Sequence, residues 1–221
     1  MQEILEQLTV CIERGKVNEA TNYPPDMHGQ LGADELTSQA VKANIAPEII
    51  LNDALMMGMK RIGDKFEAGK AFIPDMLISA KAMNVAMSHL QPFFESGAVA
   101  FKGTFVLGTV SGDLHDIGKN IVGMVLKGSG FKIVDLGVDV APEKFIQAIS
   151  EHPGCHVGMS ALLTTTMKQM GVTHLLIKEK FPETKVFIGG APVSQKFCDE
   201  IGADGYFPDP NKFSKHLAAL D

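Results

Sequence analysis

The sequence has 221 residues, of which 45% are hydrophobic and 21% charged, with a formal net charge of −6. This length suffices for one large domain or two small ones. The acidic balance argues against nucleic-acid partners and against an anionic membrane surface. No apolar run approaches the roughly 18 residues of a membrane span, and the N-terminus, MQEILEQLTV, does not resemble a signal peptide. Three widely spaced cysteines form no zinc pattern. We therefore expect a cytoplasmic protein.

The first 95 residues predict helices only. Apolar residues recur at helical spacing, most clearly in the stripe from Leu55 to Phe66. Pro47 and Pro74 stand where the first turn of a helix tolerates proline, and Pro92 and Gly97 are predicted to end the last helix. These features indicate a small helical bundle over residues 1–95.

From about residue 102 the pattern changes. Short apolar runs such as Thr104–Val110 and His156–Ser160 alternate with helical segments such as Ile117–Lys127. This alternation indicates a parallel sheet covered by helices on both faces. Five strand–helix units fit the flavodoxin-like strand order 2-1-3-4-5. The predicted fold is therefore α/β, with the helical bundle followed by a Rossmann-like, five-stranded parallel-sheet domain over residues 96–221.

In such a sheet, ligands bind outside the carboxyl ends of the strands, near the switch point between strands one and three. The loop after the first predicted strand holds one imidazole, His115, between Asp113 and Asp116. The loop after the third strand has four hydroxyls within Ser160–Thr166, and Gly189-Gly190 follow the fourth strand. A metal-ligating imidazole commonly donates its other N–H to a carboxylate. Asp113 is therefore the candidate to orient His115, and Thr166 extends that chain.

Other interpretations of this loop stay open at this point. A lone histidine between a strand and a helix is usually a surface residue, and Asp116 suits a helix N-cap. A zinc or iron site built from protein side chains needs three or four ligands, whereas the other histidines are scattered. A single protein ligand suits a metal that arrives already chelated in a macrocycle.

The combination Asp113-x-His115-x-x-Gly118, Ser160-x-Leu162 and Gly189-Gly190 resembles the signature of cobalamin-binding domains. The wider segment GTVSGDLHDIGKNIVG resembles the small corrinoid proteins that serve methanol, methylamine and methoxyl-compound methyltransferases. The segment MMGMKRIGDKFEAGKAFIPDMLISAKAM looks like the helical cap that precedes the Rossmann-like domain in those proteins and in cobalamin-dependent methionine synthase. The resemblance covers roughly residues 34–220 and leaves out Thr21–Gly32.

The resemblance implies a cobalamin or related corrinoid with His115 as the lower axial cobalt ligand, in place of the cofactor's own base. Asp113 would hydrogen-bond His115, and Thr166 stands where methionine synthase has the serine that completes this chain. Phe66 and Ile73 match the apolar cap over the upper face of the ring. Cofactor contacts, including a pocket for the displaced nucleotide tail, are implied for the other motif residues: Asp116, Ile117, Gly118, Ser160, Leu162, Thr164, Gly189 and Gly190.

The resemblance also implies a function in methyl transfer, as in methanogenesis or acetogenesis. Cob(I)alamin would accept a methyl group from a substrate:corrinoid methyltransferase, and methylcob(III)alamin would pass it to a second methyltransferase. A reductive activator would be a further partner, and the chain itself would be a carrier without catalytic residues.

Three alternatives remain from the sequence. The small subunit of an adenosylcobalamin-dependent mutase shares the histidine loop but usually lacks the helical cap. A light or cobalamin sensor would join the same two parts to a DNA-binding head. A flavodoxin-like phosphate or flavin binder would use the sheet without cobalamin.

Overall fold

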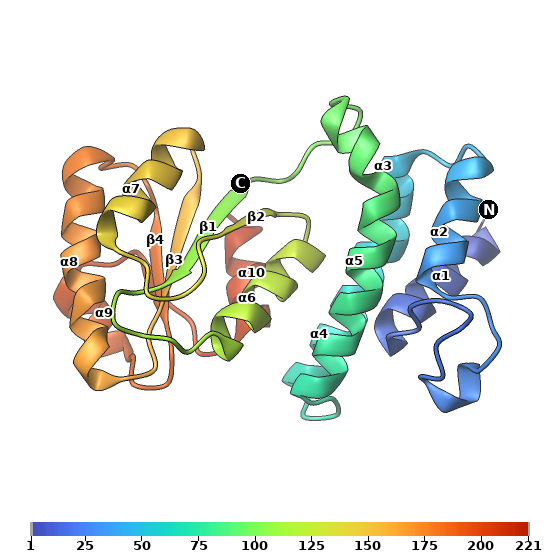
Figure 1. The fold of residues 1–221 in the computed structure, drawn as a ribbon, viewed down its shortest axis with the longest axis horizontal. Coiled ribbons are helices and arrows are strands. Elements are labelled where there is room, and N and C mark those ends of the chain that lie inside the picture. Colours follow the sequence, from blue (N-terminus) through green and yellow to red (C-terminus); the bar gives the residue numbers. More distant parts are fainter. Residues whose placement is uncertain (1, 221) are drawn as a thin grey trace. The chain divides into compact units, whose positions relative to one another are not determined.

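The computed structural model describes residues 2–220 and divides the chain into two compact units. The first unit runs to Phe101 and also includes Gly128–Gly130, and the second consists of Lys102–Lys127 and the chain from Phe131 onward. The sequence placed the boundary between residues 95 and 96. Figure 1 shows helices alone in the first unit and a sheet flanked by helices in the second. The predicted fold class, a helical part followed by a five-stranded parallel α/β domain, is confirmed. Within residues 2–220 no helix is both long enough and apolar enough to cross a membrane.

The first unit consists of five α-helices and two short helices of other types. These are α1 (Gln2–Arg14), the 3-10 helix η1 (Pro25–Met27), α2 (Ala33–Lys42), α3 (Pro47–Ile49), the π-helical stretch η2 (Ile50–Leu55), α4 (Met56–Glu67) and α5 (Ile73–Glu95). Pro47 and Pro74 lie in the first turns of α3 and α5, as predicted. α5 runs past Pro92 and ends at Glu95, so the end of the last helix lies between the two predicted residues, just before Gly97 with its φ of +74°. Pro92 lies within the final turn, so its missing N–H removes one hydrogen bond of the helix and only three helical residues follow it.

The segment Thr21–Gly32, which lies outside the resemblance, is held against the end of α1. The Arg14 guanidinium forms an ion pair with Asp26 at 2.6 Å. The ammonium of Lys16, a fully buried residue, donates to the carbonyl oxygen of Thr21 at 2.7 Å. The buried lysine therefore anchors this elaboration through the backbone rather than through a second charge.

The second unit has a single sheet whose five strands are all parallel. They are β1 (Thr104–Thr109), β2 (Lys132–Asp135), β3 (His156–Ser160), β4 (Val186–Gly189) and β5 (Gly205–Tyr206), in the spatial order β2-β1-β3-β4-β5. This is the predicted order. In the register, Thr109 lies beside Ser160 and Ser160 lies beside Gly189. The carboxyl ends of the three central strands are therefore level at one edge of the sheet.

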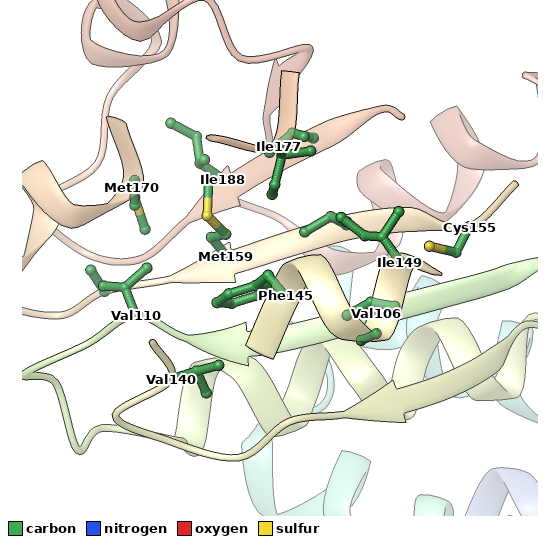
Figure 2. Close-up of a cluster of buried hydrophobic side chains, with 14 of the residues drawn as sticks. Val106, Val110, Val140, Phe145, Ile149, Cys155, Met159, Met170, Ile177 and Ile188 are labelled. Carbon is green, nitrogen blue, oxygen red and sulfur yellow. The ribbon is translucent and has the colours of Figure 1, made fainter. Parts of the chain in front are cut away.

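Helices cover both faces of this sheet. They are α6 (Ile117–Gly128), α7 (Pro142–Glu151), α8 (Thr164–Lys180), α9 (Gln195–Ile201) and α10 (Pro210–Leu217). The buried cluster on one face takes its helical side chains from α7, α8 and α9, including Phe145, Ile149 and Met170 (Figure 2). The cluster on the other face takes Leu126 and Phe213 from α6 and α10. Right-handed crossovers account for this division, because the chain reverses direction along the sheet after β2.

One buried histidine of α8 is expected to make stability depend on pH. His174 of α8 is 4% exposed, and its Nδ1 has no hydrogen-bond partner within residues 2–220. Burial lowers the pKa of His174, and the Lys178 ammonium lowers it further, while Asp204 acts in the opposite direction. The unfolded chain therefore binds a proton at His174 more readily than the folded protein does.

We expect the free energy of unfolding to fall as the pH drops below the ordinary histidine pKa of 6.5, with a slope of at most about 1.4 kcal/mol per pH unit from this group. The His174→Leu variant should lose this contribution without losing stability at pH 8. Denaturant unfolding between pH 8 and pH 5 measures the effect, with a His28→Gln variant, at an exposed position, as the control. An unchanged slope in His174→Leu would show that other groups cause the acid sensitivity.

Candidate functional site

The candidate site lies at the level carboxyl ends of β1, β3 and β4. The predicted histidine loop, the hydroxyl-rich loop and the glycine pair all begin there, because Thr109, Ser160 and Gly189 are the last residues of neighbouring strands. Val110 continues the pairing beyond β1 by donating its N–H to Ser160. The three sequence-predicted loops are therefore brought to one edge of the second unit.

Asp113 is the organising residue of this edge. Its side chain is fully buried, and its Oδ2 accepts hydrogen bonds from Thr166 Oγ1 at 2.6 Å, Leu162 N at 2.8 Å and Leu163 N at 3.2 Å. Its Oδ1 accepts from the backbone N of His115 at 3.1 Å and lies 2.8 Å from His115 Nδ1. One carboxylate thus joins the loop after β1 to the loop after β3.

These contacts keep Asp113 ionised in spite of its burial. Burial by itself raises the pKa of Asp113, but hydrogen bonds from Thr166, His115 and Leu162 outweigh it and hold the pKa well below its usual range. A carboxylate that accepts several N–H and O–H donors commonly behaves in this way. The ionised Asp113 favours the tautomer of His115 that carries its proton on Nδ1.

The His115 ring is held at one nitrogen and exposed on the rest of its surface. Its side chain is 51% exposed, while its backbone carbonyl accepts a hydrogen bond from Thr109 Oγ1 at 2.9 Å. No hydrogen bond to Nε2 is recorded in the described part of the chain. With the proton on Nδ1, Nε2 presents a lone pair, which is the form in which imidazole binds a metal.

The loops at this edge carry exposed apolar side chains and open backbone. Leu114 is 72% exposed and Ile117 68%, and Leu162 and Leu163 are also exposed. At Gly118 an added Cβ would meet no atom within 4 Å, and at Gly189 it would meet only the Phe207 carbonyl oxygen, at 4.0 Å. Exposed leucines and isoleucines beside unfilled backbone are typical of a site for a flat apolar ligand.

Gly190 differs from Gly189, because the fold leaves no room for a side chain at position 190. It has a φ of +129°, and a Cβ there would overlap the carbonyl oxygen of Ala161. The backbones after β3 and β4 therefore approach each other closely at this point. The site residues Ser160 and Thr164 lie on the same stretch, Ser160 partly buried and Thr164 exposed.

Two further predicted residues, Phe66 and Ile73, belong to the first unit. Phe66 is half-buried in the last turn of α4, and Ile73 is 41% exposed at the start of α5. Phe72 beside it is 68% exposed. The connection between α4 and α5 thus presents large apolar side chains, and the role of Phe66 and Ile73 over a corrin ring stays a prediction.

Sequence reasoning missed Asp139 in the loop after β2. Asp139 Oδ1 accepts hydrogen bonds from Gly112 N at 2.7 Å and Ser111 Oγ at 3.4 Å, and its own N–H donates to the Asp113 carbonyl at 2.9 Å. Asp139 has a φ of +51°, which aspartate tolerates better than most residues. The only sequence signal was an aspartate in a loop at the same sheet edge.

A buried lysine joins α6, the helix that follows the histidine loop, to the end of β2. Lys119 is 2% exposed, and its Nζ donates to both carboxylate oxygens of Asp135 at 2.6 and 2.7 Å and to Asn120 Oδ1 at 2.7 Å. Asn120 in turn donates to Asp116 Oδ2 at 3.0 Å. Asp116 is thus bonded to a helix side chain.

The described residues contain no group of three His, Cys, Asp or Glu side chains that would hold a metal ion.

Comparisons with known proteins agree with this geometry. Two family models match, each described as a B12 binding domain, one over residues 103–212 and one over residues 30–91. Monomethylamine corrinoid protein 2 of Methanosarcina acetivorans is 43% identical over 179 residues, which cover 78% of this chain and 82% of that protein. A corrinoid protein of Desulfitobacterium hafniense (strain Y51) is 40% identical over 177 residues, with coverage of 78% and 82%.

Solved structures give the same result over nearly the whole chain. A chain of the methanol:cobalamin methyltransferase complex MtaBC from Methanosarcina barkeri matches with a TM-score of 0.82 and 29% identity, covering 99% of this chain and 79% of that one. A cobalamin-binding protein of Desulfitobacterium hafniense DCB-2 matches with a TM-score of 0.73 and 27% identity, covering 98% of both. The expected family, corrinoid cofactor and carrier function are confirmed by these matches. This chain therefore belongs to the corrinoid proteins, the cobalamin-binding methyl carriers of methyltransferase systems.

Proposed function

We propose that this chain carries its methyl group on a corrinoid whose cobalt is bound from below by Nε2 of His115. The observation that carries the proposal is the pairing of a fully buried, ionised Asp113 with a half-exposed His115 ring at 2.8 Å. Asp113 holds the proton at Nδ1 and leaves the opposite nitrogen available. A corrinoid bound there supplies a cobalt centre that accepts and releases a methyl group.

The residues present fit such a ring system. A macrocycle needs a broad apolar surface with one donor nitrogen at its centre, and His115 stands among the exposed Leu114, Ile117 and Leu162. The empty space beside Gly118 gives backbone access without steric conflict. We assign the displaced nucleotide tail to the hydroxyls of Ser160 and Thr164 and to the open backbone at Gly189, next to the required turn at Gly190.

Thr166, Asp113 and His115 form a hydrogen-bond chain that orients the ligand. Because Thr166 and two backbone N–H groups already satisfy Oδ2 of Asp113, only Oδ1 is directed at His115. The imidazole therefore has a single favourable orientation. A carboxylate partner of this kind raises the basicity of a ligating histidine. In the first unit, we assign Phe66 and Ile73 to the apolar cover of the opposite, reactive face.

The methyl group comes, on this proposal, from a small methylated compound by way of a substrate:corrinoid methyltransferase. Relatives named for methylamines and a solved structure named for methanol support this class of methyl donor. They do not distinguish methanol from the methylamines as the donor for this chain. A second methyltransferase removes the group, and a reductive activator restores the cofactor after oxidation.

A panel of methyl donors tests this proposal. The protein would be reconstituted with hydroxocobalamin, reduced, and mixed with the methyltransferases encoded nearest to its gene. Absorbance then follows methylation with methanol, the methylamines and methoxyl compounds in turn. Methylation by one donor supports the carrier function, whereas binding of adenosylcobalamin with no methylation by any donor would favour the mutase alternative.

Gly118→Ala separates cofactor binding from folding. Because the added methyl meets no protein atom within 4 Å and alanine favours helices, we expect unfolding free energy to stay the same or rise by up to about 1 kcal/mol. Corrinoid affinity should fall roughly 10-fold, since the methyl occupies space that the ring needs. Gly103→Ala, which precedes β1 at the opposite edge of the sheet and meets Phe131 only at 3.5 Å, is the control. Equal affinities in both variants would contradict the placement of the ring beside Gly118.

A further inference from the structure

Helix α8 carries an exposed stripe that neither the fold nor the cofactor site uses. The stripe consists of Lys168, Val172, Leu175 and Glu179, all of them exposed. Val172 is 54% exposed and Leu175 69%, although both are large apolar residues. The opposite side of α8 buries its own apolar residues in the sheet-facing cluster. Helix α8 therefore has two apolar faces: one is buried against the sheet, and the stripe forms the other, which is exposed.

The spacing of the stripe is that of a coiled-coil seam. Successive members are four, three and four residues apart, which places them on one narrow strip of the helix. From the N-terminal end the stripe presents a cation, two apolar residues and an anion. A second copy that runs in the opposite direction therefore places an anion opposite the cation and apolar residues opposite the apolar residues. No ion pair is recorded for Lys168 or Glu179 within residues 2–220, so each charge is available to an outside group.

We propose that a second copy of this chain docks on this stripe, with the two α8 helices antiparallel about a two-fold axis. In this arrangement Val172 of each copy lies opposite Leu175 of the other. Lys168 of each copy then lies opposite Glu179 of the other, so both ends of the seam pair opposite charges. A two-fold contact must be self-complementary in this way. A parallel arrangement would instead place each charge beside its equal.

The antiparallel contact leaves both cofactor sites accessible. α8 begins at Thr164, and Thr166 in its first turn bonds Asp113 of the site. Antiparallel helices place these first turns at opposite ends of the dimer. The contact is small for a stable interface, so we expect a weak dimer that does not compete with partner enzymes at the site edge.

Charge exchange on the full-length protein tests the proposal by sedimentation equilibrium, with and without bound cobalamin. We expect the wild-type protein to dimerise as its concentration approaches about 1 mM or less. Lys168→Glu and Glu179→Lys should each weaken self-association at least 10-fold, because each places like charges opposite each other twice. Leu175→Glu should abolish it. Lys196→Glu, an exposed lysine on α9, is the control that should associate as the wild type does.

The decisive measurement mixes the two charge variants. Lys168→Glu and Glu179→Lys, each monomeric alone, should form a heterodimer at least as tight as the wild-type dimer, and the double variant should recover self-association. A wild-type protein that stays monomeric over the whole range overturns the proposal and leaves the stripe to a different partner. A mixture that stays monomeric, or single variants that dimerise as the wild type does, overturns the antiparallel seam.

Discussion

Replacing His115 with alanine is expected to remove the nitrogen ligand of the bound cobalt and to slow methyl transfer by at least about 100-fold. Changes to residues that only orient a metal-ligating histidine typically cost 10–100-fold, and loss of the ligand itself should exceed that range. The side chain is half exposed and its only recorded side-chain hydrogen bond is to Asp113. We therefore expect the variant to fold.

Paramagnetic resonance of the reduced cobalt(II) form measures the ligation directly. Histidine labelled with the spin-one-half nitrogen isotope should turn the triplet nitrogen splitting of the wild-type protein into a doublet. The unlabelled dimethylbenzimidazole of the cofactor would keep a triplet, so the experiment separates the two possible ligands. His28→Ala, at an exposed position in the first unit, is the control variant. A triplet that persists after labelling would rule out His115 as the ligand.

Replacing Asp113 with asparagine is expected to lower the free energy of unfolding by about 3 kcal/mol, since it breaks a buried, charge-assisted network. Each oxygen of the Asp113 carboxylate faces N–H or O–H groups, and each acts as an acceptor. An amide nitrogen at either place would face an N–H or O–H group, leaving donors unsatisfied in a buried position. Denaturant unfolding of the cofactor-free protein measures the loss.

Two substitutions of Thr166 show how much of this effect depends on the hydroxyl. Thr166→Ser keeps the donor to Asp113 and should stay close to the wild type, while Thr166→Val removes it and should cost about 1–3 kcal/mol. The same pair should separate in histidine ligation, because only the serine variant keeps Oδ2 of Asp113 fully satisfied. Equal stability of the asparagine, valine and wild-type proteins would contradict the network as an organising element.

Local pattern in the sequence determined most of the architecture. The alternation of short apolar runs with helical segments is enough to predict a parallel sheet, and five such units fit the flavodoxin-like strand order that the structure has. The site edge was predictable for the same reason, since residues after β1, β3 and β4 must meet wherever those strands end. The motif Asp113-x-His115 therefore indicated the contact between the two side chains that the structure shows, and the ligand role of His115 stays a proposal.

The tertiary structure alone decided which groups complete the site. Asp139 bonds Gly112 and Asp113 across the sheet edge, and Lys119 is buried against Asp135. These partners lie 16 to 27 residues apart in sequence. Neither pair has a local signal, because a hydrogen bond between separate loops depends on backbone positions that only the packed sheet defines. The stripe on α8 also could not be identified from the sequence, because only the burial of the other side of α8 shows which residues the sheet leaves exposed.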